Sequence, residues 1–118
     1  MKIIIKNPPR FQPLRIPSCW EVSYNSFLEL DPKELGAEKN ERWFCFTEDL
    51  LQLQHTRYDI VLDVGWYPEA DPSGHYGLVL IKGRDWQSPL VSFSTNDKAE
   101  IVEKIELLTW QVGEGYFN

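Results

Sequence analysis

The chain has 118 residues, of which 42% are hydrophobic and 25% charged, and its formal net charge is −6. This length and composition are typical of one globular domain, spanning residues 1–118, that can build a core without disulfides or metals. The longest apolar run is short, from Gly77 to Ile81, so we expect no membrane-spanning helix.

The charge is unevenly distributed along the chain. Residues 1–20 carry four basic side chains and no acidic one, whereas residues 21–118 carry eight basic and eighteen acidic side chains. An acidic body repels nucleic-acid phosphates and attracts basic proteins, although acidity also serves simple solubility. Residues 2–6 are too few for the core of a signal peptide. We therefore expect a cytoplasmic protein that binds neither nucleic acid nor membranes.

The first third of the chain predicts two strands joined by an extended segment. Residues 2–6 form a short β-branched run, and four prolines exclude regular structure across residues 7–17. In residues 20–30 the even positions are mostly apolar, which predicts a strand with one face directed inward. These inward positions are Trp20, Val22, Tyr24, Leu28 and Leu30.

The next segment predicts an exposed loop and then a short helix. Residues 31–42 are highly charged and contain both proline and glycine, as exposed loops do. Thr47 is placed to cap a helix over residues 48–55, with Phe46 and Leu51 as a hydrophobic staple. His55 would then lie at the helix C-terminus, where a cation is favourable.

Residues 58–83 predict one long β-hairpin. Apolar side chains alternate from Tyr58 to Trp66, a proline- and glycine-rich turn follows, and residues 76–81 form the returning strand. The tip is acidic and aromatic, a combination that suits binding to a basic partner.

The last segment predicts a turn at residues 83–85, a third strand of the same sheet over residues 89–93, and a helix over residues 97–112. An apolar stripe runs along this helix, and Gly113 is placed to end it. The stripe comprises Ile101, Ile105, Leu108 and Val112. The order of elements predicts an α+β fold, with an antiparallel or mixed sheet, a short middle helix, and the C-terminal helix packed on one face.

The five tryptophans divide by their positions. Trp20, Trp43 and Trp110 occupy positions that we expect to face the core. Trp66 and Trp86 lie next to turns, where we expect them to stay partly exposed. Exposed tryptophan and tyrosine flanked by charge are characteristic of protein-binding hot spots.

No motif in the chain indicates catalysis. It lacks phosphate-binding loops, dinucleotide fingerprints and zinc-protease signatures, and the two cysteines, Cys19 and Cys45, are expected to be buried thiols rather than a metal or redox pair. One alternative is a small hydrolase or metal-dependent enzyme built on the hairpin tip. Its residues would be Asp63, Glu69, Asp71 and His75.

The segments Trp20–Pro32 and Asp63–Gly83, within a small acidic α+β domain, resemble bacterial immunity proteins of contact-dependent growth inhibition and other polymorphic toxin systems. The resemblance extends over residues 20–112. It implies a cytoplasmic inhibitor, neither an enzyme nor dependent on a cofactor, that binds the toxin domain of its own system one to one. Such toxins are often basic nucleases.

We therefore expect this chain to bind a cognate toxin, with a nuclease domain as the expected target, through the hairpin and its neighbouring turn. The predicted contact residues are Asp63, Trp66, Tyr67, Glu69, Asp71, His75 and Trp86. A further alternative is a regulatory subunit that binds some other basic protein.

Overall fold

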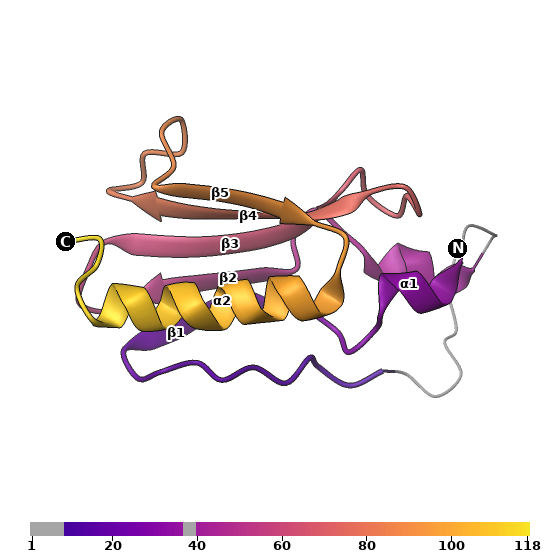
Figure 1. The fold of residues 1–118 in the computed structure, drawn as a ribbon, viewed down its shortest axis with the longest axis horizontal. Coiled ribbons are helices and arrows are strands. Elements are labelled where there is room, and N and C mark those ends of the chain that lie inside the picture. The colour runs from indigo at the N-terminus through magenta and orange to yellow at the C-terminus, as the bar shows by residue number, and fades with distance from the viewer. Residues whose placement is uncertain (1–8, 37–39) are drawn as a thin grey trace.

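The computed structural model describes residues 9–36 and 40–118, and it confirms an α+β fold with a five-stranded antiparallel sheet (Figure 1). The strands follow one another in the sheet in the order of the sequence, β1 to β5. The elements are β1 (Trp20–Asn25), α1 (Pro32–Leu35), the 3₁₀ helix η1 (Glu41–Cys45), β2 (Leu51–His55), β3 (Ile60–Tyr67), β4 (His75–Lys82), β5 (Val91–Thr95) and α2 (Lys98–Gly113).

The predicted hairpin and C-terminal helix are both present. Strands β3 and β4 pair from Ile60 with Lys82 to Tyr67 with His75. Helix α2 begins after Asp97, whose side chain accepts a hydrogen bond from the N–H of Glu100. The apolar stripe of α2 packs on one face of the sheet, while α1 lies beyond the ends of the strands (Figure 1).

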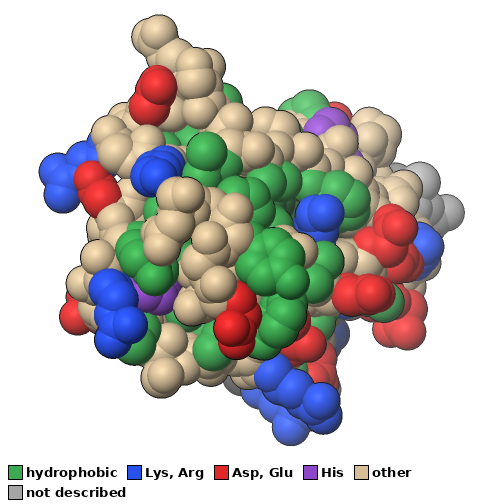
Figure 2. Space-filling view, turned by 60° about the vertical axis from the view of Figure 1, so that its left-hand side comes forward, with side chains coloured by type: hydrophobic (Ala, Val, Ile, Leu, Met, Phe, Trp, Pro, Cys, Tyr) green, Lys and Arg blue, Asp and Glu red, His purple; other side chains and the backbone are tan. Residues whose placement is uncertain are grey.

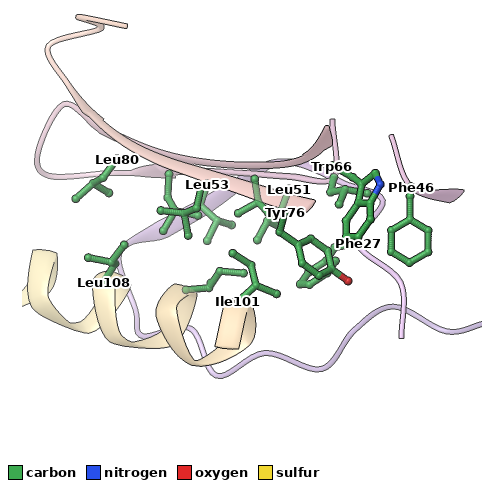
Figure 3. Packing of buried hydrophobic residues seen from close by; sticks show 14 of the residues in the cluster. Phe27, Phe46, Leu51, Leu53, Trp66, Tyr76, Leu80, Ile101 and Leu108 are labelled. Atoms are coloured by element: carbon green, nitrogen blue, oxygen red, sulfur yellow. The ribbon is translucent and has the colours of Figure 1, made fainter. Parts of the chain in front are cut away.

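The core lies between α2 and the sheet, and its aromatic side chains gather near the hairpin turn (Figure 3). Trp66 is central to this group, with its ring centroid 5.0 Å from that of Phe46 and 4.9 Å from that of Tyr76. Trp43 packs against both Phe46 and Trp66. Burial of such large rings, together with the aliphatic side chains of the core, contributes strongly to the free energy of folding.

The helix predicted over residues 48–55 is wrong, because residues 51–55 form strand β2. Leu51, Leu53 and His55 are buried and alternate with two glutamines, so this segment has the period of a strand rather than of a helix. Thr47 therefore caps no helix. The short middle helical segments lie earlier in the chain: α1 falls within the predicted exposed loop of residues 31–42, and η1 begins at the end of that loop and continues to Cys45.

The strand predicted over residues 20–30 is shorter than expected, and part of it directs its side chains to the opposite face from the one predicted. It ends at Asn25, and its register with β2 shifts between Val22 and Tyr24. Tyr24, beyond this shift, is 48% exposed, and Val22, although it pairs with the buried Leu53, is 62% exposed on this edge strand; both were expected to face inward. The expected strand at residues 2–6 lies outside the described residues.

Three further side chains are more exposed than the sequence suggested. Cys19 is exposed and Cys45 is partly buried, and neither forms a disulfide. Burial raises the pKa of the Cys45 thiol. Trp110 is 48% exposed on the outer side of α2, where it packs against Tyr116. Within the described residues, no helix combines the length and the apolar character needed to cross a membrane.

Candidate partner-binding surface

The face of the sheet opposite α2 carries most of the polar side chains of the hairpin. Because side chains alternate along a strand, the buried Leu62, Val64 and Trp66 place Asp63 and Tyr67 on this opposite face. We call it the open face. Its other members follow from the strand pairing and include Gln52, His75, Gly77, Val79, Ser92 and Ser94, while Val61 and Ile81, on the same face, are buried.

A shallow groove of about 330 Å³ crosses the open face over β3, β4 and β5. Asp63 and Tyr67 line it from β3, and Ser92 and Ser94 line it from β5. Gly77 and Val79 contribute the lining between them. The groove therefore combines a carboxylate, an aromatic ring and small polar side chains on a rigid sheet.

Asp63 is the partly buried acid of this groove. Its Oδ2 accepts a hydrogen bond of 3.0 Å from Nε2 of Gln52 on the neighbouring strand. Burial raises the pKa of Asp63, the negative charge of Asp49 raises it further, and the Gln52 hydrogen bond partly opposes this rise. The carboxylate is thus less well solvated than an ordinary surface acid, so a cation placed beside it is especially favourable.

Tyr67 lies across two glycines that face each other in the hairpin. A Cβ atom on Gly77 would lie 3.1 Å from the Tyr67 ring, so the ring covers this glycine. The Tyr67 hydroxyl donates a hydrogen bond of 3.2 Å to the main-chain oxygen of Glu48. A Cβ atom on Gly65, which pairs with Gly77, would lie only 2.0 Å from that oxygen. The two glycines therefore allow Tyr67 and residue 48 to pack closely on the open face.

A short bulge brings two more acids to this surface. Leu50 donates its N–H to the main-chain oxygen of Val64, and Trp66 donates its N–H to the main-chain oxygen of Thr47. Residues 48 and 49 lie between these two hydrogen bonds and form the bulge. The charges of Asp63, Glu48 and Asp49 act with burial to raise the pKa of the Tyr67 hydroxyl. Burial is the largest of these causes, and the three acids are the charged groups that act on Tyr67.

Glu69 and His75 lie near the same end of the open face. Oε1 of Glu69 accepts a hydrogen bond of 3.2 Å from the N–H of Glu48, which joins the turn to the bulge. His75 is exposed and pairs with Tyr67 at the start of β4. Asp63 lies four residues before Tyr67, about 13 Å along the strand, so Asp63 and His75 are well separated.

Three predicted contact residues, Trp66, Asp71 and Trp86, are placed differently from expectation. Trp66 is 1% exposed and belongs to the core, where its indole N–H donates to the main-chain oxygen of Asp71. The carboxylate of Asp71 accepts hydrogen bonds from the N–H and hydroxyl of Ser73, so it holds the turn together. These bonds lower the pKa of Asp71.

Trp86 is 50% exposed, as expected for a residue near a turn, but its turn is not a neighbour of the hairpin tip. The tip precedes β4 and Trp86 follows it, so the two lie at opposite ends of this strand (Figure 1). Trp86 therefore lies about the length of β4 away from Tyr67 and His75.

Sequence reasoning missed several residues of the surface, namely Glu48, Asp49, Gln52, Ser92 and Ser94. The serines alternate with Val91, Phe93 and Thr95, and this alternation was a usable signal for their position on the open face. The position of the bulge depends on Gly65 and had no local signal. Among the described residues, no group of three or more His, Cys, Asp or Glu side chains is arranged to hold a metal ion.

Comparison with protein-family models, with curated proteins and with solved structures finds no match to this chain.

Proposed function

We propose that this protein is an immunity protein that neutralises a cognate bacterial toxin domain by binding it, without catalysis, on the open face beside the hairpin turn. The single observation that carries the proposal is the partly buried Asp63 in a groove walled by Tyr67, with Glu48 and Asp49 close by. A basic surface, such as the substrate-binding surface of a nuclease toxin, is its chemical complement.

The groove is suited to tight binding because its charge is already partly desolvated. Folding has already removed part of the water from the Asp63 carboxylate. A lysine or arginine of the toxin therefore forms a strong contact with it at a smaller desolvation free energy on binding. Tyr67 is large and stiff and loses little rotamer entropy when a partner covers it. A tight one-to-one complex of this kind buries on the order of 1,600 Å² in total.

The exposed acids have a different role in the proposal. Glu48 and Asp49 lie at the surface, where an ion pair contributes roughly 0–1 kcal/mol. Their main effect is on the rate of encounter, since a negative surface attracts a basic toxin over distances longer than direct contact.

The first experiment is co-expression with the toxin domain encoded next to this chain. The toxin domain alone should kill cells, and co-expression of this chain should restore growth. The two purified proteins should also form a one-to-one complex. The proposal fails if killing persists at matched expression and the folded proteins do not associate.

The second experiment locates the surface with matched variants. Tyr67→Ala should weaken toxin binding by at least about 2 kcal/mol, roughly 30-fold, as expected for a hot spot. Asp63→Asn should also weaken it. Glu103→Gln removes an exposed acid from α2, on the opposite side of the sheet, and should bind as the wild type does. Melting temperatures must first show that each variant is folded. Wild-type binding by both open-face variants, with a loss in the control, would place the interface on the helix side.

A further inference from the structure

Strand β5 is a free edge of the sheet, and its sequence does nothing to protect it. Within residues 9–36 and 40–118, no strand pairs with β5 on the side away from β4. Natural sheet edges are protected by lysine, proline, bulges or a covering segment. The strand Val91–Thr95, VSFST, has neither charge nor proline, and it pairs in continuous register with β4.

The main-chain direction along this edge follows from hydrogen bonds further along the sheet. Leu50 donates its N–H to the C=O of Val64 over 3.0 Å, so the main-chain groups of Val64 point toward β2. Successive residues of a strand direct these groups to opposite sides. Asp63 therefore directs its groups toward β4, where it pairs with Val79.

The same alternation extends to β5. Leu78, next to Val79, directs its main-chain groups toward β5 and pairs with Phe93. The N–H and C=O groups of Ser92 and Ser94 must then point away from β4, toward solvent. These two residues leave a symmetrical set of donors and acceptors on either side of Phe93.

We propose that this edge binds a second copy of the chain, β5 against β5, in an antiparallel pairing centred on Phe93. Ser92 of each copy lies opposite Ser94 of the other, so every outward N–H and C=O group of these serines finds a partner. Val91 lies opposite Thr95. The two sheets become one continuous antiparallel sheet with both α2 helices on the same face, and the contact is isologous.

The distribution of charge favours a second copy over a basic partner at this edge. None of the five side chains of β5 is charged, so two acidic molecules can meet here without direct like-charge contact between the strands. A basic toxin would find no acid on the strand. On the helix side, Nζ of Lys104 lies 5.0 Å from the centroid of the Phe93 ring, and the Thr95 hydroxyl donates a hydrogen bond to the Glu100 carboxylate. The Lys104 side chains of the two copies come near the symmetry axis, where salt screens them.

Apolar side chains beyond the start of β5 extend the contact. Trp86 and Leu90, in the connection that precedes the strand, are 50% and 41% exposed. Figure 2 turns this end of the molecule toward the viewer and shows hydrophobic side chains gathered over the middle of the visible face. In the antiparallel pairing Leu90 lies opposite Asn96 of the second copy, so it is removed from water when the edges meet.

Light scattering over a range of protein concentrations tests this pairing. The mass should rise from that of one copy toward that of two, and it should rise further at higher salt because the net charge of −6 on each copy is screened. Ser94→Pro should abolish the rise, because it removes only an outward N–H, which edge strands tolerate losing. Ser23→Lys, on the opposite edge strand β1, is the matched control and should dimerise as the wild type does.

Charge-swapped variants make the test specific for the register. Ser92→Lys with Ser94→Lys places lysines opposite lysines, and the corresponding pair of glutamates places acids opposite acids, so each variant alone should be a monomer. Mixing the two should restore the mass of two copies. A wild type that remains a monomer from low to high micromolar concentration overturns the proposal, as does a dimer that survives the paired lysines. If the wild type is a monomer and the main-chain amides of Ser92 and Ser94 become slow to exchange only when the toxin is bound, the edge takes a strand of the toxin, and self-pairing is overturned.

Discussion

Asp63 is an acid that the fold carries at a cost in stability. Its folded-state pKa is raised by burial, so the folded protein binds the proton more readily than the unfolded chain does. Stability is therefore lost as the pH rises from about 3.9, the unfolded value, through the folded pKa. A residue that lowers stability at neutral pH while lying in a groove is a candidate for binding rather than for folding.

Asp63→Asn tests this cost directly. The variant should be more stable than the wild type at pH 7 by about 0.5 kcal/mol, a small gain because solvent screens the half-exposed carboxylate. The gain should disappear near pH 3, where the wild-type carboxylate is protonated in both states. Urea unfolding at the two pH values measures the difference, with Asp85→Asn in an exposed turn as the control. Equal destabilisation of Asp63→Asn at both pH values would mean that Asp63 serves only to hold Gln52.

His55 has a structural role, and it gives the folding stability a pH dependence opposite in sign to that of Asp63. It is 4% exposed, and its Nδ1 accepts hydrogen bonds of 3.1 Å from the N–H groups of Arg57 and Tyr58. Its ring stacks on Tyr58 and meets the edge of Trp20. Burial, with the nearby charge of Arg57, lowers the pKa of His55. The neutral ring is therefore the form that the fold requires.

Acidification should destabilise the folded protein through His55. The stabilisation is complete above pH 6.5, the unfolded value, and is lost as the pH falls toward the folded pKa, with a slope of at most about 1.4 kcal/mol per pH unit for one proton. Urea unfolding between pH 7.5 and pH 5 measures this slope. His55→Asn keeps a side-chain acceptor for the turn but does not titrate, so its slope should be shallower. Identical slopes for the two proteins would exclude His55 as the titrating group.

At the scale of the element, the β3–β4 hairpin depends on a pair of glycines with unequal surroundings. Gly65 faces a main-chain oxygen, which cannot move without disturbing the bulge at residues 48–49. Gly77 faces the ring of Tyr67, a side chain that can turn aside. An added methyl group should therefore destabilise the fold much more at Gly65 than at Gly77.

Gly65→Ala should cost about 3 kcal/mol or more of unfolding free energy, whereas Gly77→Ala should cost about 1 kcal/mol. Thermal or urea unfolding measures both. Gly77→Ala should also displace Tyr67 from the sheet and weaken toxin binding, although the protein stays folded. Equal costs for the two substitutions would show that the bulge adjusts as easily as a side chain.

The elements that the sequence predicted well are those with long periodic patterns. The hairpin has alternation over a whole strand, and α2 has an apolar stripe over several turns, so local signals outweighed competing ones. Strand β2 has only five residues, and the cap-like Thr47 before it imitates the start of a helix. The bulge at residues 48–49 depends on a glycine in another strand, which no local pattern reveals.

The contact residues were predicted unevenly for a related reason. Trp66 is in phase with Ile60, Leu62 and Val64, which indicates the core, whereas its position next to a turn indicates exposure, and in the structure the strand phase decides. Asp63 and Tyr67 have the opposite phase and do lie on the open face. The hairpin tip precedes β4 and Trp86 follows it, so the two lie at opposite ends of this strand.

At the scale of the whole molecule, charge should govern how fast the toxin arrives. The association rate should fall by about tenfold or more between low and high salt, because salt screens the long-range attraction of the acidic body. The dissociation rate should change much less, since desolvated contacts are poorly screened. Stopped-flow measurements at several salt concentrations separate the two rates. An association rate indifferent to salt would remove electrostatic steering, whereas self-pairing through β5 should strengthen under the same conditions.

The sheet order has a consequence for how the molecule opens. β3 has paired neighbours on both sides, and α2 covers its apolar face, whereas β5 has β4 on one side only. Main-chain amides of β3 therefore become accessible to solvent only when the whole domain unfolds, while those of Ser92 and Ser94 are accessible in the folded monomer. Deuterium uptake by single residues would display this gradient, and in the paired form the two serine amides should become slow.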